Sequence, residues 1–511
     1  MPQRFVCLFV LFLGVAGMAS PSGVAAQEAK LDPATMPPIG TVDVRFLSYN
    51  VEMVEVIGGR FWKPYGASAG NAKDPYQYRP PIDLSNARLR KLAAALGPAY
   101  MRVSGTWANS VYFHDADSPP PPKAPQGFNG VLTRAQWKGV IDFARAVNAQ
   151  IVTSFSTSPG ARDRNGVWQP EQARQLLQYT RSLGGRIAAA EFMNEPTYAG
   201  LGGAPKGYDA AAYGRDIAVF APFFRQAAPD AMFLGPGSVG EGPYAMAIGG
   251  NVLSTESLLK ATGPAFDAFS YHLYAAASQR CAPLGIKVQT TARDALSEEW
   301  LTRPLKIHAF YAGERDRFEP GKPIWITETA QAACGGDPWA STFLDSFRYL
   351  IEHGELARRG VQTVMHNTLA SSDYGLLDDK TFAPRPNYWA ALLWKRLMGA
   401  TVLDPGATTA SNVFIYAHCM AGRPGAVAVL VVNADRQRAY AVTSTMRAAS
   451  YTLSASEPQA KSARLNGKDL TLGAGDELPP LPAGDNGDAL RVAPTSIAFL
   501  GYAEAGNPAC R

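Results

Sequence analysis

Arg186-Ile-Ala-Ala-Ala-Glu-Phe-Met-Asn-Glu-Pro196 is the stretch from which the fold of this chain is most easily read. A mostly apolar run follows a Gly-Gly pair and stops at Asn194, Glu195 and Pro196. Such a run predicts a buried parallel strand, and Pro196 ends it because proline has no N–H for the next hydrogen bond of the sheet. The stretch therefore predicts a strand with a carboxylate at its carboxyl end.

A second stretch, Lys322-Pro-Ile-Trp-Ile-Thr-Glu-Thr329, has the same form. Barrel enzymes carry their chemistry at the carboxyl ends of the strands, so Glu195 and Glu328 are expected on one rim. Taken alone, each carboxylate is equally well explained as a polar residue that ends a strand. Taken together, they are what retaining glycoside hydrolysis needs: one acid/base and one nucleophile, about 5–5.5 Å apart.

Strands and helices alternate eight times along the chain. The expected strands are 42–49, 99–104, 150–155, the first quoted stretch, 232–235, 266–272, 323–327 and 360–366. The expected helices are 86–96, 133–147, 170–183, 210–227, 255–262, a broken one at 289–310, 340–359 and 388–398. This alternation predicts an α/β fold, a (β/α)₈ TIM barrel over residues 41–400. Glu195 then lies on the fourth strand, as the candidate acid/base, and Glu328 on the seventh, as the candidate nucleophile.

Beyond residue 400 the pattern changes to short alternating runs, such as 426–432, 439–442 and 496–500, separated by Gly, Pro, Asn and Asp. These runs predict a C-terminal β-sandwich domain over residues 401–511. Residues 27–40 form a spacer rich in Pro and Ala, and they are a candidate extra strand of that sandwich. Residues 1–26 have the features of a signal peptide: Arg4, an apolar run, and small residues up to a cleavage site near Ala26.

The composition fits an exported globular protein. The 511 residues are 47% hydrophobic, and a net charge of +5 is too small over this length to indicate a nucleic-acid partner. After the signal, no apolar run approaches the roughly 20 residues of a membrane-spanning helix. We expect a periplasmic or extracellular protein with no stable membrane anchor once the signal is cleaved; an uncleaved anchor is the alternative.

Four cysteines remain after the signal, and an even number in an exported chain predicts two disulfides. Four cysteines can pair in three ways. Their order in the chain favours Cys281–Cys334 across two rim loops and Cys419–Cys510 within the tail. No Cys or His pair has the spacing of metal ligands, so neither a metal nor an organic cofactor is expected.

Several motifs resemble glycoside hydrolase family 79, the heparanases and β-glucuronidases of the retaining (β/α)₈ clan. The likeness runs in order from about residue 41 to about residue 404, and it rests on Phe46-Leu-Ser48, Pro98-Ala-Tyr-Met-Arg-Val-Ser-Gly-Thr106, Asn194-Glu195-Pro196, Trp325-Ile-Thr-Glu-Thr329 and Asp378-Asp-Lys-Thr-Phe-Ala-Pro-Arg-Pro-Asn-Tyr-Trp389. The resemblance implies retaining hydrolysis of β-D-glucuronides, with a β-glucuronide or another uronate-containing oligosaccharide as the partner. It also implies the Cys419–Cys510 bridge.

Carried over by position, the resemblance implies a set of substrate-binding residues: Asn194, Glu52, Gly105, Thr106, His272, Tyr274, Cys334, Gly335, Gly336 and Tyr374. Several of them have a purely structural alternative. Glu52 is otherwise a solvated loop residue, His272 a core histidine, and the two tyrosines packing residues. Three tryptophans in rim loops are candidates either for stacking on a sugar face or for loop packing: Trp62, Trp107 and Trp339.

The loop after Glu328 departs from the family pattern. The family has a Tyr followed by glycines whose N–H groups hold the uronate carboxylate, whereas Ala333 and Cys334 stand here at the Tyr and first Gly positions. Backbone donors survive this change, and Gly335 and Gly336 still permit a close approach. Glucuronate specificity is therefore less firmly predicted than the reaction type. Two alternatives stay open: an endo-acting enzyme on uronate polysaccharides, and a catalytically silent carbohydrate-binding protein.

Overall fold

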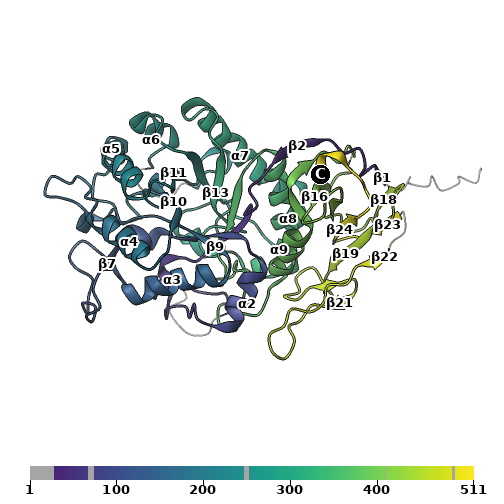
Figure 1. Cartoon of the computed structure of the whole chain (residues 1–511), viewed down its shortest axis with the longest axis horizontal. Helices are drawn as coiled ribbons and strands as arrows, with labels where there is room; N and C mark the ends of the chain where they lie inside the picture. The colour runs from purple at the N-terminus through teal and green to yellow at the C-terminus, as the bar shows by residue number, and fades with distance from the viewer. Residues whose placement is uncertain (1–27, 67–73, 247–251, 408, 486–488) are drawn as a thin grey trace, which may run out of the picture.

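The computed structural model describes residues 28–66, 74–246, 252–407, 409–485 and 489–511 (Figure 1). The predicted signal peptide lies outside these residues. Within them, no helix combines the length and the apolar character that crossing a membrane requires. Figure 1 shows a barrel with helices around it beside a layered arrangement of strands from the end of the chain.

Eight parallel strands close into one barrel, which confirms the predicted (β/α)₈ fold. In the order of the chain they are β3 (Leu47–Asn50), β6 (Ala99–Val103), β9 (Ala149–Thr153), β10 (Ile187–Glu191), β11 (Met232–Ser238), β12 (Ala268–Leu273), β13 (Ile324–Thr329) and β14 (Thr363–His366). Each strand pairs with the next in this order, and β14 pairs with β3 to close the ring. The carboxyl ends of all eight strands therefore meet on one rim.

The helices lie on the outside of the barrel (Figure 1). They are α2 (Ala87–Ala95), α3 (Arg134–Ala146), α4 (Glu171–Ser182), α5 (Ala210–Ala227), α6 (Thr255–Thr262), α7 (Glu298–Phe318), α8 (Phe343–Arg358) and α9 (Pro386–Leu397). Thr133 caps α3, because its hydroxyl accepts from the Gln136 N–H. Asn86 caps α2, because its side-chain oxygen accepts from the Leu89 N–H.

Three predicted boundaries differ most from the structure. The first barrel strand begins at Leu47 and not at residue 42. Residues 38–41, in the spacer that was a candidate extra strand of the tail, pair with a strand of the tail. In place of the broken helix expected over residues 289–310, the structure has one continuous helix, α7, which begins at Glu298. Its buried face continues through Pro304. The fourth strand ends at Glu191, so Asn194 and Glu195 lie in the loop after it. Glu195 has a left-handed φ of 49° and directly precedes a 3₁₀ turn, η3 (Pro196–Tyr198).

The remaining strands form two sheets beside the barrel. One has nine strands: β2 (Pro38–Thr41), β15 (Met398–Leu403), β16 (Val413–Met420), β17 (Val427–Asn433), β24 (Ser496–Tyr502), β19 (Ala449–Ser454), β20 (Arg464–Leu465), β21 (Lys468–Asp469) and β22 (Gly484–Asp485). The other has three: β1 (Glu28–Leu31), β18 (Tyr440–Ser444) and β23 (Ala489–Val492). The segment before the barrel thus adds a strand to each sheet.

The central strand β17 shows how the sheets and the barrel pack. All of its residues are buried. Ala428, Leu430 and Val432 belong to the core shared with the barrel helices, whereas Val427, Val429 and Val431 belong to the core between the two sheets. Because successive side chains of a strand point to opposite faces, a strand buried on both sides needs an unbroken apolar run.

Smaller elements shape the rim. A short helix, α1 (Met53–Ile57), follows β3, and two small sheets rise from the loops. The strands β4 (Gly59–Trp62) and β5 (Tyr76–Arg79) pair antiparallel, and β7 (Val111–His114) and β8 (Gly130–Thr133) pair in parallel. Both predicted disulfides are present. Cys281–Cys334 joins the loops after β12 and β13, and Cys419–Cys510 joins β16 to the end of the chain.

Candidate active site

A cavity of about 970 Å³ opens where the barrel strands end. Eight of the predicted site residues line it: Glu52, Thr106, Asn194, Glu195, Tyr274, Glu328, Cys334 and Tyr374. The other four support it from positions described below: Gly105, His272, Gly335 and Gly336. The closed barrel therefore brings residues from six different strand ends into one site.

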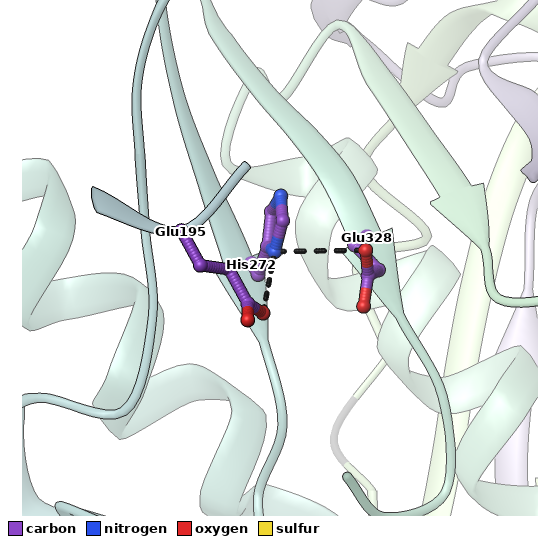
Figure 2. Close-up of side chains that lie close together, drawn as sticks. All are labelled: Glu195, His272 and Glu328. Atoms are coloured by element: carbon purple, nitrogen blue, oxygen red, sulfur yellow. Dashed lines mark hydrogen bonds and ion pairs between the residues drawn. The ribbon is translucent and has the colours of Figure 1, made fainter. Parts of the chain in front are cut away.

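Glu195 and Glu328 lie on either side of His272 (Figure 2). One carboxylate oxygen of each Glu and the Nδ1 atom of His272 all lie within 4.8 Å of one another. Nδ1 is 2.9 Å from Oε1 of Glu195 and 3.7 Å from Oε2 of Glu328. The Glu195 side chain is 20% exposed and the Glu328 side chain 8% exposed. Glu195 is thus the carboxylate that solvent reaches more easily.

Three donors fix the orientation of Glu328. The Tyr274 hydroxyl donates to Oε1 at 2.6 Å, and Asn367 Nδ2 donates to the same oxygen at 3.2 Å. Arg102 Nη1 donates to Oε2 at 2.9 Å. A carboxylate bound by a phenol, an amide and a guanidinium is presented to the cavity in one orientation.

Arg102 is itself held by a buried carboxylate. Its guanidinium binds Oε2 of Glu191, the last residue of β10, with nitrogen–oxygen distances of 2.9 and 3.1 Å. The hydroxyls of Ser270 and Thr327 donate to Oε1 of Glu191 at 2.7 Å. Although burial opposes it, Arg102 lowers the pKa of Glu191 below its ordinary value. A buried cation needs such a partner, and this one anchors Arg102 behind the two candidate catalytic carboxylates.

The same guanidinium sets the tautomer of His272. Arg102 Nη2 lies 3.2 Å from Nε2, and because a guanidinium only donates, Nε2 is the acceptor and Nδ1 carries the proton. Nδ1–H then donates to Glu195. Arg102 also donates to Oδ1 of Asn194 at 2.7 Å, while Asn109 holds the Asn194 backbone through both its N–H and its C=O. The Asn194–Glu195 segment is therefore fixed despite lying in a loop.

Glu52 is a buried residue beside the candidate nucleophile, not a solvated loop residue. Its Oε1 accepts from Asn367 Nδ2 at 3.1 Å, and its buried Oε2 has no hydrogen-bond partner among the described residues. Burial and the neighbouring Glu328 raise the pKa of Glu52 well above its ordinary value, against the effect of Arg102. A Cβ at Gly105 would fall 1.5 Å from Oε2, so only glycine leaves room for this carboxylate.

The loop after Glu328 is fixed to the neighbouring loop at two points. Cys334, with a left-handed φ of 63°, is bonded to Cys281, and Ala333 pairs with Ala277. The next two positions have no room for a larger residue than glycine. A Cβ at Gly335 would lie 2.7 Å from Cβ of Trp62. One at Gly336 would lie about 3 Å from the Cβ atoms of Ala340 and Tyr374.

Two of the three candidate stacking residues line the cavity. Trp62 stacks on Tyr76 with ring centroids 4.6 Å apart, and Trp107 meets both rings edge-on. Trp339 does not line the cavity, because it is buried against Trp300. Loop packing is therefore the role of Trp339.

The three atoms within 4.8 Å also raise the question of a metal ion, since two carboxylates and an imidazole are a known ligand set. The surroundings argue against a cation here. Arg102 lies 2.9 Å from Glu328 and 3.2 Å from the far nitrogen of His272. An added positive ion would be repelled by this guanidinium, which contacts two of the three candidate ligands.

Three residues of the site were not predicted: Arg102, Glu191 and Asn367. Arg102 and Glu191 both left a signal, because each is a charged residue inside a stretch predicted as a buried strand, and such charges are almost never buried unless paired. Asn367, which contacts Glu52, Tyr274, Glu328 and Tyr374, left none. An Asn after a strand is an ordinary turn residue.

Comparisons with known proteins found a matching family model and several related sequences. Residues 80–354 match the family model described as glycosyl hydrolase family 79, N-terminal domain. Heparanase-like protein 1 of Arabidopsis thaliana is 26% identical over 458 residues, covering 86% of this chain and 79% of that protein. Baicalin-beta-D-glucuronidase of Scutellaria baicalensis is 34% identical over 186 residues, 34% of this chain and 35% of that protein.

Among solved structures, a 4-O-alpha-L-rhamnosyl-beta-D-glucuronidase of Fusarium oxysporum superposes with a TM-score of 0.63. The match covers 92% of this chain and 99% of that one, at 14% sequence identity. The likeness shows that the two proteins share a fold over nearly their whole lengths.

Proposed function

This chain belongs to glycosyl hydrolase family 79, and we therefore propose that it is a retaining β-glucuronidase that hydrolyses β-D-glucuronides by double displacement. The observation that carries the proposal is that one carboxylate oxygen of Glu195 and one of Glu328 lie within 4.8 Å of each other across the cavity. Retaining glycosidases place their carboxyl groups about 5–5.5 Å apart, whereas inverting ones leave about 6.5–9.5 Å for a water molecule.

In the proposed reaction, Glu328 attacks the anomeric carbon and Glu195 gives its proton to the departing oxygen. The C–O bond to the aglycone breaks, and a glycosyl ester of Glu328 forms. Glu195 then takes a proton from a water molecule, which attacks the same carbon and releases Glu328. The bonds from Tyr274, Asn367 and Arg102 hold the nucleophile in line for both steps.

His272 supports the change of role of Glu195. As the donor to Oε1, the imidazole leaves the other oxygen of Glu195 to exchange a proton with the leaving group and then with water. Glu52 and Asn194, which both line the cavity, are the proposed contacts of sugar hydroxyls next to the reacting carbon. The Cys334–Gly336 loop and Tyr374 are the proposed contacts of the uronate carboxylate.

The sugar is proposed from the similarity to a β-D-glucuronidase and from the survival of backbone donors in the Cys334 loop. A second candidate is endo-acting cleavage of a uronate polysaccharide, which the similarity to a heparanase-like protein favours. We further propose export of the protein, since two disulfides are typical of an oxidising compartment.

Variants of the two carboxylates test the reaction. On 4-nitrophenyl β-D-glucuronide, Glu195→Gln is expected to lower kcat/KM by about 10²–10⁴-fold, the usual contribution of a general acid/base, and Glu328→Ala by at least as much. Added azide is expected to restore turnover in Glu328→Ala and to give the α-glucuronosyl azide, because the small anion enters the space of the lost carboxylate. Glu171→Ala, on the exposed side of α4, is the control.

Two further measurements separate the alternatives. Proton NMR of the first product should show the β anomer, and an α product would remove the nucleophile role of Glu328. Comparison of aryl glucuronide, galacturonide, glucoside and xyloside tests the sugar, and preference for a neutral sugar would contradict a carboxylate-reading loop. Binding without hydrolysis of any sugar would indicate a carbohydrate-binding protein.

A further inference from the structure

We propose that the wall of the cavity beside Glu195 is an aglycone site for a flat apolar group, which makes aryl β-D-glucuronides the substrate class. This inference rests on the β-glucuronidase activity proposed above. A proton donor must reach the leaving oxygen, so the aglycone lies on the Glu195 side of the cavity. The chemistry of that side therefore decides which aglycones bind.

The first part of this wall follows Glu195 directly in the chain. The turn η3 leads to Leu201, Gly202 and Gly203, all of which line the cavity. A Cβ at Gly202 would lie 2.6 Å from the Asn109 side chain, which is the group that holds the backbone of Asn194. The Leu201 segment is thus packed against the support of the proton donor, at a fixed distance from it.

The wall continues on the neighbouring strands β7 and β8. Gly203 packs on Ser110, whose C=O accepts from the Asn129 N–H at the start of β8. A Cβ at Gly130 would meet Cδ1 of Ile57 at 2.8 Å and a methyl group of Val111 at 3.3 Å. The aliphatic side chains Ile57, Val111 and Val131 line the cavity as Leu201 does, and Ser110 and Asn129 are the polar residues of this part of the lining.

Aliphatic side chains offer no hydrogen bonds to the hydroxyls of a second sugar. Leu201 is 59% exposed, so a large apolar side chain stands in water at this edge of the site. An aromatic ring that covers Leu201 removes apolar surface from water. A sugar that covers Leu201 loses hydrogen bonds from its hydroxyls to water, and Leu201 offers none in return. This difference favours an aromatic aglycone over a carbohydrate one.

The charge of the cavity points the same way. Its lining residues include three carboxylates, Glu52, Glu195 and Glu328, and one cation, Arg60, whose guanidinium is already bonded to Asp74. A sulfated or uronate-rich polymer needs cations along its path. The lining of this cavity does not offer them. Its volume of about 970 Å³ is near the upper end of sites for drug-sized ligands, so there is room for a ring system beyond one sugar.

Uncleaved thioglycosides test the site without the effect of leaving-group reactivity. Phenyl and methyl 1-thio-β-D-glucuronide are measured as competitive inhibitors of 4-nitrophenyl β-D-glucuronide hydrolysis by the full chain. We expect the inhibition constant of the phenyl compound to be at least about tenfold lower, since the ring covers the apolar wall. Leu201→Ser should reduce the ratio of the methyl to the phenyl inhibition constant by about threefold or more. Val44→Ser, an equally exposed aliphatic residue outside the cavity, should leave it unchanged.

The outcomes distinguish the two proposals. Hydrolysis of the glucuronide with equal inhibition by the phenyl and methyl compounds overturns the aryl aglycone site and leaves the β-glucuronidase intact. Stronger inhibition by a sulfated glucuronide disaccharide than by the phenyl compound overturns it as well. Absence of any hydrolysis of 4-nitrophenyl β-D-glucuronide removes the proposed function itself. If Leu201→Ser and Val44→Ser change the ratio of the two inhibition constants equally, Leu201 is not part of the aglycone site.

Discussion

Glu52 illustrates how a single residue can serve a site at the expense of the fold. Burial and the Glu328 carboxylate raise its pKa well above the ordinary value, although Arg102 opposes them. In the unfolded chain the same carboxyl ionises at its ordinary pKa. As the pH rises from that value towards the folded pKa, the unfolded state loses its proton first, so the free energy of unfolding falls.

Glu52→Gln is therefore expected to stabilise the fold in a pH-dependent way. The variant and the parent should melt at similar temperatures below about pH 4, where the Glu52 carboxyl is largely neutral in both the folded and the unfolded chain, and the variant should melt higher near about pH 7.5. The measurement is the melting temperature across this range, with the exposed Glu171→Gln as control. A difference between variant and parent that does not grow with pH would show that Glu52 carries no such cost.

For single residues, the side chains at the strand ends could be predicted from the sequence, but their hydrogen-bond partners could not. Glu195 and Glu328 follow from two local patterns of apolar residues. The bonds from Arg102 to Glu191, Glu328, Asn194 and His272 join four strands, and no local pattern states which strands meet at that depth. The charges of Arg102 and Glu191 inside predicted buried strands were the available clues.

Between elements, the Cys281–Cys334 disulfide links the loop after β12 to the loop after β13. The disulfide closes a loop with a sequence separation of 53, and the Ala277–Ala333 bridge lies beside it. The second disulfide, Cys419–Cys510, spans 91 positions in the tail and lies outside the cavity lining. Both bonds are disulfides, but one lies at the cavity and the other in the tail. Removal of one is therefore the control for removal of the other.

Removal of each disulfide should separate stability from substrate binding. The Cys281→Ser/Cys334→Ser and Cys419→Ser/Cys510→Ser double variants are each expected to lose about 2–4 kcal/mol of unfolding free energy. Only the first should also raise KM for an aryl glucuronide, because the freed Cys334–Gly336 loop no longer presents its backbone to the sugar. Urea unfolding and steady-state kinetics measure both. An unchanged KM in the first variant would place the carboxylate contact elsewhere.

The elements themselves were largely predictable, because each helix and strand has its own apolar period and end signal. Both α5 and α6 match their predicted bounds. The errors arise where distant pairing decides. The first barrel strand starts at Leu47 and not at residue 42, and β10 ends at Glu191, after which Asn109 holds the backbone of Asn194.

Over the whole molecule, the two described ends of the chain complete the same pair of sheets. β1 pairs with β18 and β2 with β15, and the turn between β1 and β2 contacts the segment after β24. The buried Asn507 makes this contact. Its Nδ2 donates to the C=O groups of Pro33 and Met36 at 2.8 and 2.9 Å, and its Oδ1 accepts from the Ala509 N–H.

Asn507→Ala should therefore loosen the start of the folded chain. The change leaves two buried C=O groups without their donor, and each such loss costs about 1–3 kcal/mol. We expect a lower urea midpoint and faster proteolysis between residues 28 and 41, while kcat/KM on an aryl glucuronide stays near the parent value because the barrel rim is untouched. Asn165→Ala, at an exposed turn, is the control. Equal stability and equal protease resistance in Asn507→Ala and Asn165→Ala would mean that pairing of β1 and β2 alone holds the segment.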